Sequence, residues 1–257
     1  IHMIGHVIKL FPQEHDIIFI CNEEHLNNTS YKMEEIIHKY CKSGKIISIK
    51  PHKYGPGYAV LQAKKEINLD EPVIVNYCDF SCYWDWTEFK KFVKKDSFDG
   101  VIPAYKGFHP HSLGNTNYAY IKEKNGLISD IQEKKPFTKN RMEEFASSGT
   151  YYFSKGKILL DSINAIIREK YTINGEYYIS LAYKNLLKNQ KKVAVYPLQH
   201  FFQWGTPQDL EEYLFWSKTF NLILEKRKKL NNFESSLIIP MAGLGKRFSD
   251  AGYKKTK

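Results

Sequence analysis

Short apolar runs alternate with longer amphipathic segments along most of this 257-residue chain. Five runs are rich in β-branched residues and bounded by polar ones, as buried parallel strands are: Ile17–Cys21, Ile46–Ile49, Val73–Tyr77, Val101–Ala104 and Val193–Tyr196. Six segments space their apolar residues three and four apart, which predicts helices: Tyr31–Lys42, Gly57–Glu66, Trp86–Lys94, Lys157–Lys170, Gly175–Asn189 and Asp209–Lys229. Because strands alternate with helices, the pattern predicts an α/β fold with a doubly wound, mostly parallel, Rossmann-like sheet.

A second pattern predicts a small antiparallel insertion. Tyr118–Lys122, Ile128–Gln132 and Thr150–Phe153 are short apolar runs without helices between them. Asn125-Gly126 separates the first two, and this dipeptide favours a tight hairpin turn. We therefore expect these three runs to form a meander over one edge of the main sheet.

Composition bounds the class of protein. Hydrophobic residues make up 42% of the chain, enough for a sizeable core, and no apolar run approaches the length of a membrane span. No charged-then-apolar leader precedes the body. The four cysteines lack the paired spacing of a zinc site, so free thiols in a reducing cytoplasm are expected. We expect a cytoplasmic globular domain without a membrane partner.

The net charge of +10 has two interpretations. A basic surface can bind nucleic acid. The lysines are scattered over predicted helix faces and turns, however, so solvated surfaces are favoured and a nucleic-acid partner is not expected. A basic domain also suits a nucleoside triphosphate and a phosphate monoester, so the charge alone does not separate these alternatives.

The segment near the C-terminus carries the most specific motif. An apolar strand, Leu237–Pro240, runs into a glycine-rich turn with two cations, Lys246 and Arg247. Backbone N–H groups and positive side chains arranged in this way surround a polyphosphate. The expected nucleotide-binding residues of the turn are Met241, Ala242, Gly243, Leu244, Gly245 and Lys246. The segment resembles the signature loop of the sugar-phosphate nucleotidyltransferases, especially the branch of capsule and surface-polysaccharide synthesis.

In that family the signature loop opens the domain, whereas here it follows the body. Ile1–Ile8 resembles the helix that comes after the loop in the family. The resemblance therefore implies a body at residues 1–232 and a head of the same domain at 233–257. A permuted domain, a piece of a tandem array and numbering out of order all remain open. In each case we expect Leu237–Pro240 between the strands Ile17–Cys21 and Val73–Tyr77.

The resemblance also implies roles for residues at the ends of strands, where open α/β sheets bind ligands. Arg247 and Lys257 match the arginine and lysine that offset charge on the α-phosphate. Asp79 ends a predicted strand; it resembles the metal aspartate and suits Mg²⁺, although an aspartate there can also be a turn former. Gly55 and Gly57 resemble the segment whose backbone groups recognise a pyrimidine base.

Acceptor binding is implied by three further motifs. Glu133 and Lys134 resemble the Glu-Lys-Pro element, in which the glutamate accepts hydrogen bonds from the acceptor and the lysine binds its phosphate; Lys135 is an insertion before the proline. An exposed, charged strand end is the alternative. Gly149 is expected to give clearance for a substrate, and Glu176 to line the pocket. The neighbouring tyrosines, Tyr177 and Tyr178, are expected in the core.

One feature departs from the family. Many relatives carry a second metal aspartate shortly before a Gly-Thr pair, where this chain has Gln203 and Trp204. Asp209 follows Pro207 and fits the first turn of a helix, where a carboxylate offsets the helix dipole. The resemblance thus implies one protein carboxylate at the metal, with phosphates and water as the other ligands.

Together these features predict an Mg²⁺-dependent nucleotidyltransferase. It would join a nucleoside triphosphate, with CTP the first choice, to a phosphorylated acceptor and release pyrophosphate. Phosphoglutamine and a sugar 1-phosphate are both open as the acceptor. A basic, non-catalytic module that binds nucleotides or nucleic acid is the alternative from a different class.

Overall fold

The computed structural model describes residues 1–109, 112, 117–227, 250 and 252, and it divides into the units Ile1–Tyr213 and Leu214–Lys257. The strands are β1 (Ile18–Asn22), β2 (Lys45–Ile49), β3 (Val73–Asn76), β4 (Phe80–Tyr83), β5 (Gly100–Tyr105), β6 (Ala119–Lys124), β7 (Leu127–Glu133), β8 (Phe145–Ser147), β9 (Thr150–Phe153), β10 (Val193–Leu198) and β11 (His200–Gln203). The α-helices are α1 (Met3–Ile8), α2 (Glu23–Asn27), α3 (Met33–Tyr40), α4 (Pro56–Gln62), α5 (Trp86–Lys95), α6 (Gly156–Arg168), α7 (Ile179–Lys188) and α8 (Pro207–Arg227). Short 3₁₀ helices are η1 (Thr29–Tyr31), η2 (Lys64–Glu66) and η4 (Arg141–Glu143).

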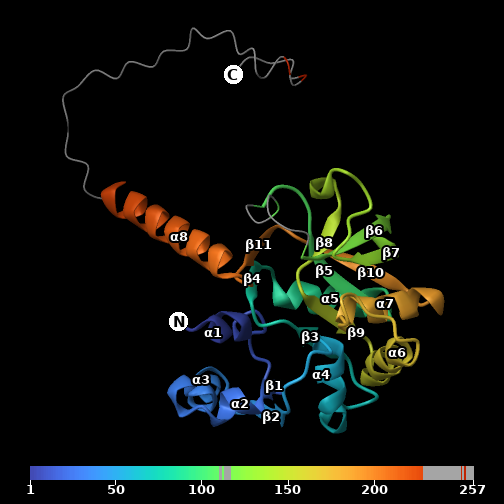
Figure 1. Ribbon diagram of the computed structural model, residues 1–257. Helices are drawn as coiled ribbons and strands as arrows, with labels where there is room; N and C mark the ends of the chain where they lie inside the picture. The colour runs from blue at the N-terminus through green and yellow to red at the C-terminus, as the bar shows by residue number, and fades with distance from the viewer. Residues whose placement is uncertain (110–111, 113–116, 228–249, 251, 253–257) are drawn as a thin grey trace. The chain divides into compact units, whose positions relative to one another are not determined.

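The first unit contains a large mixed sheet and two small strand pairs (Figure 1). The large sheet has the order β10-β7-β6-β8-β5-β9-β3, and β10 also pairs with β5. The parallel pair β1–β2 lies beside α2 and α3, shown in blue in Figure 1. The antiparallel pair β4–β11 joins the chain after β3 to the segment before α8. Each predicted strand and helix of the described residues is present, with ends shifted by a few residues.

The structure does not confirm a mostly parallel sheet. Within the described residues, β1–β2 and β5–β10 are parallel, and the other pairings are antiparallel. The expected hairpin of β6 and β7 is present, and its turn places Asn125 and Gly126 at φ values of 53° and 79°. β9 is not part of an edge meander, because it lies between β5 and β3 within the sheet.

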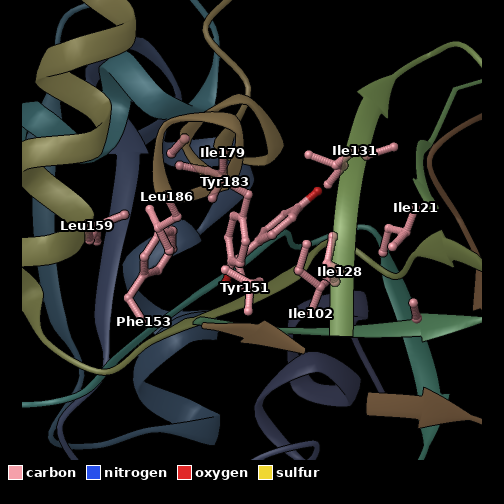
Figure 2. Packing of buried hydrophobic residues seen from close by; sticks show 14 of the residues in the cluster. Ile102, Ile121, Ile128, Ile131, Tyr151, Phe153, Leu159, Ile179, Tyr183 and Leu186 are labelled. Carbon is pink, nitrogen blue, oxygen red and sulfur yellow. The ribbon is translucent and has the colours of Figure 1, made fainter. Parts of the chain in front are cut away.

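One buried cluster fixes the sheet to the helices that cover it. Its members come from the sheet, α4, α6 and α7 and include Ile102, Ile131, Tyr151, Leu159 and Ile179 (Figure 2). Tyr183 of α7 is fully buried, and its hydroxyl donates to the carbonyl oxygens of Val101 at 3.1 Å and Tyr152 at 2.5 Å. Because a buried tyrosine hydroxyl needs such partners, Tyr183 locks α7 to β5 and β9.

Two expectations from composition can be compared with the described residues. All four cysteines are free thiols. The described helices, including the 21-residue α8, are not both long and apolar enough to cross a membrane.

Candidate active site

Asp79 lies at the junction of β3 and β4, and the β4–β11 pair holds the chain there. The backbone N–H of Trp204 donates to the Asp79 carbonyl at 2.8 Å. A Cβ atom added to Gly205 would lie 2.9 Å from Oδ2 of Asp79, so the glycine backbone packs directly against the carboxylate. Burial raises the pKa of Asp79, a backbone hydrogen bond opposes this change, and the charge of Asp209 raises the pKa further.

Asp209 has the expected place in the first turn of α8. Its backbone N–H donates to Oγ1 of Thr206 at 3.2 Å, and Oγ1 of Thr206 donates to Oδ2 of Asp209 at 2.6 Å. This reciprocal pair caps the helix. The sequence predicted the first-turn position of Asp209, but neither the cap with Thr206 nor the effect of Asp209 on the pKa of Asp79. Two acidic groups therefore share this region, although no three of the described His, Cys, Asp and Glu residues form a metal-binding group.

The chain at Glu133 and Lys134 turns sharply as β7 ends. Lys134 has a φ of 57°, and its backbone N–H donates to the Tyr118 carbonyl at 2.8 Å. This left-handed conformation is uncommon for a residue other than glycine. Glu133 is 8% exposed and accepts a hydrogen bond from Oγ of Ser180 at 2.6 Å.

Glu133 is a poorly solvated carboxyl group. Its pKa is raised to about 7, with burial as the largest cause; the Ser180 hydrogen bond and the charge of Lys134 oppose this rise, and the charge of Glu176 adds to it. These causes show that Glu133, Lys134 and Glu176 lie in one electrostatic neighbourhood. Near neutral pH, small changes around Glu133 decide whether it is an anion or a hydrogen-bond donor.

Lys134 is held by the side chains of Glu176 and Tyr178. Its ammonium donates to the Tyr178 hydroxyl at 2.5 Å, lies 4.6 Å from the centre of that ring and is 4.0 Å from Oε2 of Glu176. The Tyr178 hydroxyl donates to the same Glu176 oxygen. Both tyrosines expected in the core, Tyr177 and Tyr178, are half-buried instead. The structure thus brings together three of the residues predicted for acceptor binding.

Gly55 and Gly57 pack against the segment that carries Glu176. Gly57 N–H donates to the Tyr177 carbonyl at 2.7 Å, and Tyr177 N–H donates to the Tyr54 carbonyl at 2.8 Å. Added Cβ atoms would lie 2.8 Å from Cβ of Glu176 at position 55 and 2.7 Å from the Tyr177 carbonyl oxygen at position 57. The glycines are needed for this close packing, and the Gly57 amide is already engaged; base recognition by the loop stays a prediction.

Gly149 packs against Tyr77 and Phe80, which flank Cys78 and Asp79 in the chain. Its carbonyl accepts from Tyr77 N–H at 3.1 Å, and it has a φ of 95°. An added Cβ would lie 3.1 Å from Cε1 of Phe80 and 3.2 Å from Cδ2 of Tyr77. The clearance that Gly149 provides therefore serves these two rings, and clearance for a substrate stays a prediction.

The predicted residues of the signature loop are not placed by the structure. Met241, Ala242, Gly243, Leu244, Gly245, Lys246, Arg247 and Lys257 lie outside the described residues. The described site therefore consists of Asp79 with Asp209, and of Glu133 with Lys134 and the segment 176–180.

Solved structures share this fold. No protein-family model and no curated protein matches the sequence. The nucleoside-diphosphate-sugar pyrophosphorylase from Vibrio cholerae RC9 superposes with a TM-score of 0.65 at 16% identity, over 82% of this chain and 86% of that one. A UDP-glucose pyrophosphorylase complexed with UDP-glucose gives a TM-score of 0.61 at 15% identity, over 84% and 87% of the two chains. The chain has the mixed α/β fold of these pyrophosphorylases.

Proposed function

We propose that this protein transfers a nucleotidyl group from a nucleoside triphosphate to the phosphate of a small acceptor. The observation that carries the proposal is that the same fold holds two groups of charged side chains. One group is a carboxylate pair, Asp79 after β3 and Asp209 in the first turn of α8; the other is a Glu-Lys pair, Glu133 and Lys134, at the end of β7. Tyr77, two residues from Asp79, lies between them: its ring is 5.8 Å from that of Tyr151, whose pKa is raised by burial and, to a smaller extent, by the charge of Glu133.

The proposed reaction is a single displacement. An oxygen of the acceptor phosphate attacks the α-phosphorus, the bond between the α-phosphorus and its bridging oxygen to the β-phosphate breaks, and pyrophosphate leaves; no covalent enzyme intermediate forms. Lys134 would bind the acceptor phosphate, and Glu133 would bind the group that carries this phosphate. Arg247 and Lys257 would offset the negative charge that develops around the α-phosphate.

The residues around Asp79 fit a magnesium ion. Asp79 and Asp209 repel each other in a partly buried region, and a divalent cation would relieve that repulsion. Mg²⁺ is commonly held by one or two carboxylates together with substrate phosphates and water. When bound, it would neutralise charge on the triphosphate and the incoming phosphate. Asp79 is the proposed protein ligand.

The head of the domain, residues 233–257, is part of the proposal. Among the described residues, β1 pairs with β2 alone and β3 pairs with β9 alone, so each keeps one edge without a strand. Ile20 of β1 and Val75 of β3 pack against the same buried cluster. Leu237–Pro240 is apolar enough to fill the place between them. This insertion would bring the signature loop beside Asp79.

For the substrates, we favour CTP, by likeness of the sequence to the capsule branch. Phosphoglutamine is the first acceptor to test, as in a CTP:phosphoglutamine cytidylyltransferase of capsule or surface-polysaccharide synthesis, and a sugar 1-phosphate is the second. The two carboxylates near Lys134 support an acceptor with a positively charged group, since a carboxylate binds an ammonium more strongly than it binds a hydroxyl.

Pyrophosphate release by the full chain tests the proposal. The assay pairs each nucleoside triphosphate with phosphoglutamine, with several sugar 1-phosphates and with no acceptor, in the presence of Mg²⁺. We expect acceptor-dependent release that is fastest with CTP. If no pair gives release and the protein binds single-stranded nucleic acid with a steep salt dependence, a basic binding module replaces the enzyme.

A further inference from the structure

The segment from Glu176 to Ser180 contacts the Glu-Lys pair through every second side chain. Glu176 and Tyr178 contact Lys134, and Ser180 contacts Glu133. Tyr178 has extended backbone angles, φ −80° and ψ 148°, just before α7 begins. Ser180 follows two residues later, in the first turn of α7, so a short non-helical stretch and the start of the helix together carry the three contacts.

The same segment also contacts the loop at residues 54–57. The backbone of Tyr177 makes two hydrogen bonds with that loop, and the side-chain carbon of Glu176 fills the space that Gly55 leaves open. Residues 176–180 therefore form a connector between the loop predicted for the nucleotide and the pair predicted for the acceptor. We use the name connector for these five residues.

The C-terminal end of the connector is the most firmly held. Ile179 is fully buried in the cluster that contains Ile131 of β7 and Tyr151 (Figure 2). An ion pair of 2.5 Å between Lys184 and Asp130 also joins α7 to β7. Because both flanking elements are fixed, the Ser180 hydroxyl has little freedom to leave Glu133.

We infer that Ser180 and Tyr178 are positioning residues for the acceptor, with Ser180 orienting Glu133 and Tyr178 orienting Lys134. The inference rests on the proposed function. The hydroxyl of Ser180 donates a hydrogen bond to Oε2 of Glu133, so the other carboxylate oxygen would bind the acceptor. Tyr178 donates its proton to Glu176 and accepts from Lys134, so it holds the ammonium near the site until a phosphate competes for it.

The physical consequence concerns the charge of Glu133. Its surroundings include the cation of Lys134, the carboxylate of Glu176 and the phenols of Tyr77, Tyr151 and Tyr178. A hydrogen bond donated to a carboxylate stabilises its ionised form. Loss of the Ser180 hydroxyl should therefore raise the pKa of Glu133 above its present value of about 7 and keep the group protonated at higher pH.

Carbon-13 NMR of side-chain carboxyl groups tests this inference on the full chain without any substrate. Glu133→Gln identifies the Glu133 signal, and its titration is compared in the wild type and in Ser180→Ala. Ser162→Ala is the matched control, since Ser162 is also a buried helical serine but contacts Asn185 instead, at 3.3 Å. We expect an upward shift of the midpoint in Ser180→Ala and none in the control. An unchanged midpoint in Ser180→Ala overturns the role of Ser180.

Kinetics then separates this inference from the proposed function. In Ser180→Ala, the pH profile of kcat/KM for the acceptor should move to higher pH, while KM for the triphosphate stays within about twofold. Tyr178→Phe keeps the ring and removes the hydroxyl, so it should raise the acceptor KM several-fold. If the wild type releases no pyrophosphate, the proposed function fails even when the midpoint shifts. If it is active and neither variant changes acceptor kinetics, the positioning role alone fails.

Discussion

Gly205 packs against the carboxylate of Asp79, since a Cβ atom at position 205 would lie only 2.9 Å from Oδ2. The added atom would also meet the side-chain amide of Gln203. Both neighbours are ends of flexible side chains, so Gly205→Ala should fold with a loss of stability of about 1 kcal/mol or less. We expect it to move Asp79, to lower kcat about tenfold or more and to raise the Mg²⁺ concentration for half-maximal activity. Gly126→Ala, in the distant hairpin, is the control for kcat.

Asp79→Asn tests the carboxylate itself. The amide keeps the size of the side chain but removes the charge proposed to bind Mg²⁺, so activity should fall at least 10²-fold (an order-of-magnitude expectation) and the Mg²⁺ requirement should rise. Asp70→Asn, at a largely exposed aspartate 3.8 Å from Lys155, controls for a change of net charge. An unchanged Mg²⁺ titration in Asp79→Asn would assign Asp79 to the turn between β3 and β4.

Arg247→Ala tests the signature loop. Loss of one preorganised charge at the α-phosphate should lower kcat by about 10²–10³-fold, which corresponds to about 2.7–4 kcal/mol. The thermal unfolding midpoint should barely change. Arg168→Ala, at the last turn of α6, serves as the control for removal of an arginine. Near-normal kcat in Arg247→Ala would indicate that Arg247 and the signature loop have a structural role and not a catalytic one.

The sequence predicted the described elements well where one pattern governs one element. Val73–Tyr77 is a clear strand, and Asp79 follows it as expected. The order of the strands could not be predicted from the pattern. A short apolar run such as Thr150–Phe153 fits an edge or an interior position, and only its pairing with β3 and β5 places it inside the sheet. β4 and β11 were missed, since each has four residues and their pairing joins positions far apart in the chain.

Among the residues predicted for acceptor binding, some were likewise found from the sequence and others only from the structure. The Glu133–Lys134 motif and Glu176 could be found from the sequence, whereas the contacts of Tyr178 and Ser180 could not. The apolar spacing after Gly175 predicted a helix from that residue. Gly175 is instead in a turn with a φ of 82°, and the helix begins at Ile179. The residues between Gly175 and Ile179, which form the first part of the connector, are too few to give a periodic signal in the sequence.

Hydrogen exchange tests the proposed insertion of Leu237–Pro240. If this strand fills the place between β1 and β3, amides on the facing edges of Ile18–Asn22 and Val73–Asn76 should be protected in the full chain. Ile238→Asp would place a charge in the buried strand, so these amides should exchange at least tenfold faster (an order-of-magnitude expectation). Ser235→Asp, just before the strand, is the control. Equal exchange in both variants and the wild type would show that Leu237–Pro240 does not lie between β1 and β3.

The choice of acceptor can be decided at Glu133 and Lys134. Lys134 should bind the phosphate that every candidate shares, so Lys134→Ala should raise KM about tenfold or more for all acceptors, while Lys135→Ala, at the exposed insertion, should not. Glu133 should contact the rest of the acceptor. A carboxylate near an ammonium forms a charge-assisted bond that is roughly twice as strong as a neutral one. Glu133→Gln should therefore reduce kcat/KM more for phosphoglutamine than for a sugar 1-phosphate, measured well above pH 7 so that the wild-type group is ionised. An equal loss with both acceptors would show that Glu133 does not select a cationic group, and the sugar 1-phosphate would then be the better candidate.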